Sequence, residues 1–158
     1  EQALLLYPTE LVSDELYAGW DNVTLRELRV GDGNVSVFVF DVHINNQQIP
    51  TVFDLGATVS LMNRRGARAL DVLVRSPRTP PDIQGVVGST EVLAELHVWR
   101  LEISNSVWRN RIFLVGDFPV FRKLGIDRDP AAIAVADLFA GRDFVVDFSR
   151  RRLLVKSK

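Results

Sequence analysis

Short apolar segments with an alternating pattern dominate the chain. In residues 34–44 (NVSVFVFDVHI), valines at every second position face one side of a predicted strand, and phenylalanines face the other side. Residues 45–48 (NNQQ) predict a turn, and residues 49–53 (IPTVF) predict a second strand. This hairpin places Asp54 at the end of its second arm.

Three further segments have the composition of β-strands, at residues 89–103, 107–115 and 142–155. Within the second segment, "RN" either forms a turn or interrupts the strand. Within the third, residues 147–150 (DFSR) predict a turn between two apolar arms. The pattern therefore predicts a mainly β protein built from hairpins.

Two short helices are expected between the strands, at residues 62–70 and 136–142, with Asp137 as the N-cap of the second. Residues 71–82 contain three prolines and predict an exposed connection. Residues 1–34 are expected to form an N-terminal arm or strand, and residues 35–158 the main domain, so that the whole chain is a single domain.

Composition narrows the classes of function. The chain has 158 residues, 47% of them hydrophobic, and a formal net charge of -1, which predicts no attraction to nucleic acid or to an anionic membrane. The arginines at 150–152 are expected to be a solvated strand end. There is no cysteine, which excludes disulfides and a thiol nucleophile. No apolar run approaches the ~18 residues of a membrane helix.

The first residues lack both an initiator Met and the cationic segment of a signal peptide. The chain is therefore expected to be a mature or trimmed product. A periplasmic or secreted location after removal of a signal stays open at this point.

The candidate chemistry emerges by elimination. His43 and His97 lie far apart inside strand-like segments, and no cluster of acids accompanies either at metal-ligand spacing, so we expect structural histidines and no metal site. The glycine segments at 31–34 (GDGN) and 85–89 (GVVGS) lack the features of a phosphate-binding loop. Asp54 remains as the candidate catalytic group.

Three separated segments resemble retropepsin-like aspartic peptidases, particularly bacterial single-lobe members. Residues 44–70 are similar to the strand, turn and strand that lead into the family's Asp-Thr/Ser-Gly-Ala-Thr/Ser motif, with matches at Asp54, Gly56, Ala57 and Thr58. Residues 83–92 (IQGVVGSTEV) resemble the flap hairpin, with Gly85, Val86, Val87 and Gly88 at its tip. Residues 124–155 resemble the closing segment, with Ala134, Val135 and Asp137 in the second motif.

The resemblance implies a closed or partly open acid-protease-type β-barrel of one lobe, with one or two short helices. One lobe supplies one catalytic acid, so the family pattern implies a homodimer in which Asp54 faces the partner's Asp54 and hydrolyses a peptide or protein substrate. Thr58 would add a hydroxyl donor beneath the acids. No cofactor and no metal is expected.

Two positions depart from the family pattern. Leu55 replaces the Thr or Ser whose hydroxyl reaches across the dimer, and Val135 replaces a glycine that lets a strand pass close under the active-site loop. Val135 therefore predicts a displaced or remodelled site. An active peptidase and a degenerate relative that binds peptides or dimerises both remain open. A β-rich binding domain without protease ancestry is a third alternative.

Overall fold

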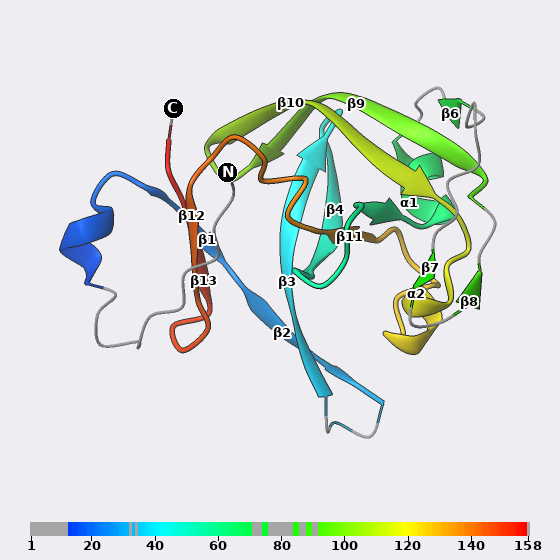
Figure 1. Ribbon diagram of the computed structural model, residues 1–158, viewed down its shortest axis with the longest axis horizontal. Coiled ribbons are helices and arrows are strands. Elements are labelled where there is room, and N and C mark those ends of the chain that lie inside the picture. Colours follow the sequence, from blue (N-terminus) through cyan, green and yellow to red (C-terminus); the bar gives the residue numbers. More distant parts are fainter. Residues whose placement is uncertain are drawn as a thin grey trace.

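A six-stranded closed barrel forms the centre of the protein. The computed structural model describes residues 13–31, 33, 35–70, 74–75, 84–85, 88–89 and 92–157. The barrel strands follow the order β3–β4–β11–β5–β10–β9, and pairing of β3 with β9 closes the ring (Figure 1). Their bounds are β3 (Val35–Ile44), β4 (Gln47–Phe53), β5 (Leu61–Met62), β9 (Ala94–Ile103), β10 (Ser106–Val115) and β11 (Ala132–Ala134).

The predicted hairpins are present. β3 and β4 pair antiparallel across Asn45 and Asn46, whose φ angles of 50° and 63° lie in the left-handed region that suits a tight hairpin turn. β9 and β10 turn at Ser104 instead of at "RN". Asn110 lies inside β10 with a φ of 54°, and the strand continues through it, so "RN" neither turns nor interrupts the strand.

A second, three-stranded sheet joins the two ends of the described chain. It contains β1 (Asp21–Thr24), β13 (Arg152–Val155) and β12 (Phe144–Asp147), with β13 in the middle. β2 (Arg26–Val30) pairs with β3 and extends the barrel sheet, and β6 (Val74–Arg75) pairs with β9 at the other edge. A short 3-10 helix, η2 (Asp14–Tyr17), precedes β1.

One of the two expected helices is present, and the other is not. Helix α1 (Arg64–Ala69) begins after Asn63, whose side chain accepts a hydrogen bond from the Gly66 amide as an N-cap. Residues 136–142 instead form consecutive turns, so the second predicted helix is wrong. Helix α2 (Pro119–Lys123) was not predicted.

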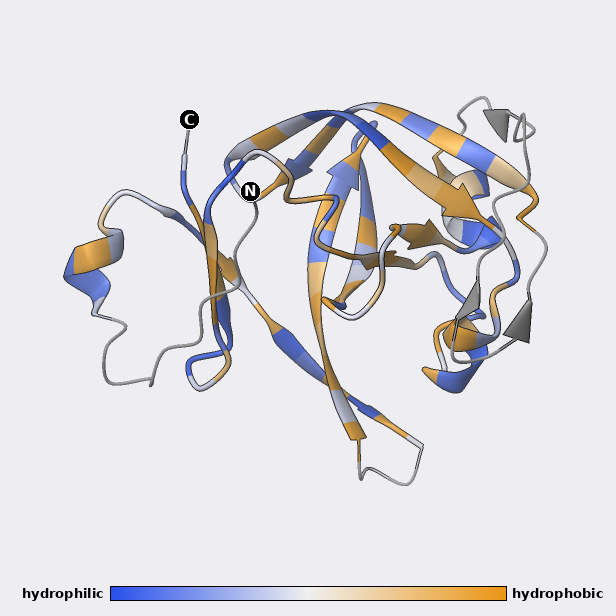
Figure 2. Ribbon diagram, viewed as in Figure 1, coloured by the Kyte–Doolittle hydropathy of each residue, from blue (hydrophilic) through white to orange (hydrophobic). Residues whose placement is uncertain are grey.

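Two apolar clusters share the barrel strands. Phe40, Val42 and Ile44 of β3 belong to the larger one, and Val39 belongs to the smaller one beside α2, as the alternating pattern predicts. Figure 2 shows hydrophobic and hydrophilic residues alternating along β9, whereas β10 ends in a hydrophobic run. The parts of the chain that the structure describes contain no helix long and apolar enough to cross a membrane.

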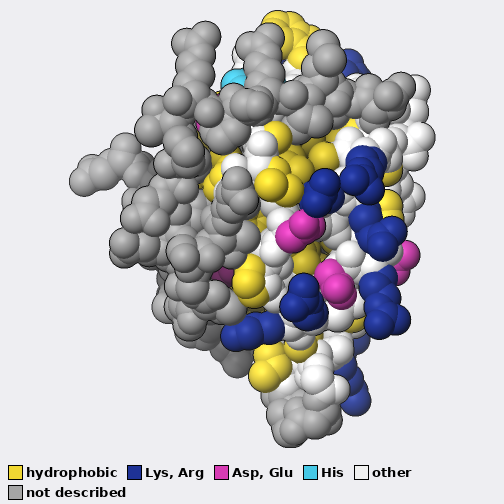
Figure 3. Space-filling view, turned by 90° about the vertical axis from the view of Figure 1, so that its right-hand side faces the viewer, with side chains coloured by type: hydrophobic (Ala, Val, Ile, Leu, Met, Phe, Trp, Pro, Cys, Tyr) yellow, Lys and Arg dark blue, Asp and Glu magenta, His cyan; other side chains and the backbone are white. Residues whose placement is uncertain are grey.

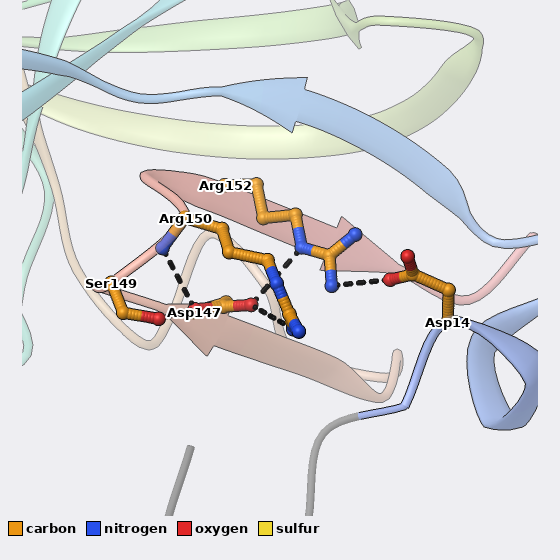
Figure 4. Close-up of polar contacts among 5 residues, drawn as sticks. All are labelled: Asp14, Asp147, Ser149, Arg150 and Arg152. Atoms are coloured by element: carbon orange, nitrogen blue, oxygen red, sulfur yellow. Dashed lines mark hydrogen bonds and ion pairs between the residues drawn. The ribbon is translucent and has the colours of Figure 1, made fainter. Parts of the chain in front are cut away.

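A buried carboxylate holds the β12–β13 turn (Figure 4). The Asp147 side chain is only 2% exposed and accepts hydrogen bonds from the Ser149 hydroxyl, the Arg150 amide and the guanidinium groups of Arg150 and Arg152. Burial by itself would raise the pKa of Asp147. The four hydrogen bonds outweigh burial and hold its pKa well below the usual value.

The arginines at 150–152 therefore form ion pairs with acidic residues of the fold. Arg151 pairs with Glu27 at 2.9 Å, and Arg152 bridges Asp147 and Asp14 at 3.1 and 2.5 Å. These contacts fasten the end of β13 to β2 and η2. The run is a set of structural ion pairs and not simply a solvated strand end.

Candidate active site

Asp54 follows β4 directly, where the barrel strand enters a loop. Its amide donates a hydrogen bond to the Ala134 carbonyl at 2.9 Å, which continues the parallel pairing of β4 with β11. The residue is partly exposed. The backbone of Asp54 is thus fixed by the barrel, while its carboxylate reaches the loop surface.

Gly56 orients the carboxylate of Asp54. The Gly56 amide donates a hydrogen bond to Asp54 Oδ1 at 2.8 Å. A Cβ atom at position 56 would lie 3.2 Å from the same oxygen, which is closer than ordinary packing allows. Glycine is favoured here because the backbone approaches the acid closely, and not because the turn needs a left-handed φ.

A second acid holds the end of this loop. Asp137 Oδ1 accepts the Ser60 hydroxyl at 2.5 Å, and Asp137 Oδ2 accepts the Ser60 amide at 3.1 Å. The Ser60 hydroxyl oxygen in turn accepts the Val135 amide at 3.3 Å. Ser60 is fully buried, so the loop that begins at Asp54 is tied at both ends to the segment around β11.

This arrangement corrects the expectation for Asp137. No helix begins there, and its carboxylate binds a loop 77 residues earlier in the chain instead of capping a helix. Ser60 was not singled out from the sequence. The available signal was a hydroxyl residue between apolar neighbours immediately before a short strand, a position where burial forces the hydroxyl to find a partner.

Leu55 and Val135 pack into the two apolar clusters. Leu55 is partly buried against the larger cluster, and Val135 is fully buried in the smaller one, where Ala57 also packs. Val135 was expected to indicate a displaced or remodelled site, which stays a prediction; in this structure Ala134 and Val135 are both hydrogen-bonded to the loop. Thr58 is exposed in the single chain, and the buried hydroxyl of the loop is that of Ser60.

The expected flap is described only in part. β7 (Gln84–Gly85) and β8 (Gly88–Ser89) pair antiparallel, with Gly85 opposite Gly88. Val86 and Val87 lie outside the described residues. The pairing fits a hairpin at the predicted place, and its role stays a prediction.

Both histidines lie on strands at exposed positions, and His97 contacts Glu95 at 3.3 Å. Across the described ranges, no three potential metal-binding side chains come together. Asp54, the Gly56 amide and the Ser60–Asp137 pair are therefore the polar elements from which a site can be built.

Solved structures with a similar fold have been found. The chain is similar to a retropepsin-like aspartic protease from Rickettsia conorii, with a TM-score of 0.55, 17% identity, and coverage of 87% of this chain and 90% of that one. It is also similar to the retroviral protease-like domain of Ddi1 from Leishmania major, with a TM-score of 0.59, 20% identity, and coverage of 79% and 92%.

The chain has a retropepsin-like fold. The mainly β barrel with two short helices matches one lobe of these proteins along most of its length. No family model matches the sequence, and no curated protein matches it. The retropepsin-like fold is thus established by shape, and the reaction must be argued from the site.

Proposed function

We propose that this protein is an aspartic peptidase that acts as a homodimer, with Asp54 of each chain forming the catalytic pair. The observation that carries this proposal is the geometry at Asp54. The carboxylate lies at the end of a barrel strand, is oriented by the Gly56 amide, and belongs to a loop bound at both ends to β11 and the turn after it. Such preorganisation is what a catalytic carboxylate requires.

The chemistry needs two carboxylates and a water molecule. Two acids about 3 Å apart cannot both ionise, so the pair shares one proton. The ionised Asp54 takes a proton from the water, which attacks the peptide carbonyl. The protonated Asp54 hydrogen-bonds the carbonyl oxygen and stabilises the charge that develops there.

The substrate would be a peptide or protein segment in an extended conformation. The hairpin formed by β7 and β8, with Gly85 and Gly88 beside its tip, would close over this segment and bind its backbone as a neighbouring strand does. Cofactors and metals have no role in this mechanism.

A peptide library assay tests the proposal. The purified chain should cleave a mixed peptide library between pH 3 and 7, a pepstatin-like inhibitor should block cleavage, and Asp54→Asn should abolish it. Asp143→Asn is the matched control, because Asp143 is an exposed acid whose ion pair, among the described residues, is with the exposed Lys156. Equal activity of Asp54→Asn and Asp143→Asn would contradict the proposal.

The second candidate function is peptide binding or dimerisation without catalysis. Leu55 favours it, because a leucine at this position has no hydroxyl to hydrogen-bond the partner's loop, and its side chain packs against the core of its own chain. Leu55→Thr separates the candidates. Cleavage that appears only in Leu55→Thr supports the degenerate protein, whereas cleavage by the unaltered chain excludes it.

A further inference from the structure

A basic hollow lies between the two helices, on the face shown in Figure 3. It has a volume of about 300 Å³ and is lined by Arg64, Arg65 and Arg68 of α1 and by Arg122 of α2. In Figure 3, dark blue side chains gather around a few magenta and yellow ones. A volume at the lower end of the usual range for ligand pockets fits a small ligand.

The charges of the hollow are unbalanced. Four arginines line it against two acids, Asp117 and Asp127, although the whole chain has a net charge of -1. Arg64 pairs with Asp117 at 3.2 Å. Arg65, Arg68 and Arg122 have no hydrogen-bond or ion-pair partner among the described residues. Three guanidinium groups are therefore available to a ligand.

Helix α1 presents its arginines on a fixed support. The Asn63 side chain accepts the amides of Gly66 and Ala131 and donates to the carbonyls of Ile126 and Asp129. Gly66 lies so close to Met62 that a Cβ atom there would be 2.9 Å from the Met62 side chain. The backbone of α1 cannot shift without breaking these contacts, so the positions from which its arginines extend are fixed.

Two buried aromatic residues also border the hollow. Phe118 and Phe121 line it, and they are 4% and 1% exposed. Arg64 and Arg68 are four residues apart on one helix, where like charges repel each other and a bound anion would relieve the repulsion.

We propose that this hollow is a binding site for a compact oxyanion with two or more negative charges. The planar guanidinium groups match the paired oxygens of both phosphate and carboxylate groups. Because Arg122 comes from a different helix than the other three arginines, a ligand with two anionic groups would contact both helices at once. The site does not depend on Asp54 or on peptidase activity.

Calorimetric titration at low salt with two probes tests this site. Pyrophosphate represents the phosphate source and citrate the carboxylate source, and saturable binding of either one supports the proposal and identifies the preferred group. The double variant Arg68→Gln/Arg122→Gln should weaken binding by about tenfold or more, since it removes charged hydrogen bonds from both helices. Arg29→Gln, which removes an exposed arginine of β2, should change binding less than about twofold.

Two further measurements test where the probes bind and whether the site is independent of Asp54. Amide chemical shifts of the unaltered chain should change at Gly66 and around Phe121 on titration, which does not depend on the folding of any variant. Asp54→Asn should bind the probes like the unaltered chain. The proposal is overturned if neither probe binds saturably, if the shifts map elsewhere, or if Arg29→Gln weakens binding as much as the double variant does.

Discussion

The contact between Asp137 and Ser60 should be one of the main supports of the loop that carries Asp54. Replacement of Asp137 by alanine removes the acceptor of two hydrogen bonds, from the Ser60 hydroxyl at 2.5 Å and from the Ser60 amide at 3.1 Å. Ser60 is fully buried, so its two donors would lose their partner where water has little access.

The magnitude follows from these two donors. A buried donor without a partner costs roughly 1–3 kcal/mol, and partial access of water from the side of Asp137 places each cost toward the lower end. Asp137→Ala should therefore lower the free energy of unfolding by about 2–4 kcal/mol. For a chain of this size this corresponds to a drop in Tm of roughly 4–16 °C.

Urea unfolding at pH 7 measures this loss. The dependence of the unfolding free energy on urea concentration is compared between variants, so that a change in stability is distinguished from a change in the unfolded state. Asp143→Ala is the control on the same segment and should change the free energy by less than about 0.5 kcal/mol, because its ion pair with Lys156 is exposed. A double-mutant cycle with Ser60→Ala should give a coupling energy of about 1–2 kcal/mol. A loss equal to that of Asp143→Ala, or additive effects in the cycle, would refute the reasoning.

Three other substitutions test the remaining contacts. Gly56→Ala should lower peptidase activity by about tenfold or more at nearly unchanged stability, because its Cβ would lie 3.2 Å from the Asp54 carboxylate; unchanged kcat would contradict this. Val135→Gly restores the glycine of the family pattern but removes a buried side chain. It should therefore lower the free energy of unfolding, measured in urea, by about 2–4 kcal/mol. Asp147→Asn should lower the free energy of unfolding at pH 7. Because the pKa of Asp147 is lowered in the folded state, its stabilisation is lost on protonation, so the difference in unfolding free energy between the variant and the unaltered chain should shrink as pH falls below about 4. A constant difference between pH 7 and 2 would count against this.

The hairpins could be predicted because alternation and turn residues are local signals. Helix α2 carried such a signal too, with Pro119 at its first position and Gly125, at a φ of 70°, after its end, but the segment is only five residues long. The helix predicted at residues 136–142 was wrong because aspartate is a common N-cap residue, so Asp137 suggested the start of a helix. Its carboxylate binds Ser60 instead, and a contact across 77 residues leaves no periodic trace in the sequence.

In the candidate site, too, local contacts could be predicted from the sequence and long-range contacts could not. Asp54 and Gly56 could be predicted because their contact spans two residues. The partners of Ser60 could not be identified, because they depend on the segment around β11 lying beside it. The clustering of Arg122 with the three arginines of α1 depends likewise on how two helices pack, although each arginine is visible in the sequence.

The structure also separates two ways in which this chain could have lost activity. Val135 and Leu55 both depart from the family pattern, but they act at different places. Val135 fills a buried position, and the segment around β11 is hydrogen-bonded to the loop within one chain. Leu55 lacks a hydroxyl that only a partner chain would meet. If the chain acts as the proposed homodimer, a loss of catalysis is expected at the contact between its two Asp54 loops, and Leu55→Thr rather than Val135→Gly is the substitution expected to restore it.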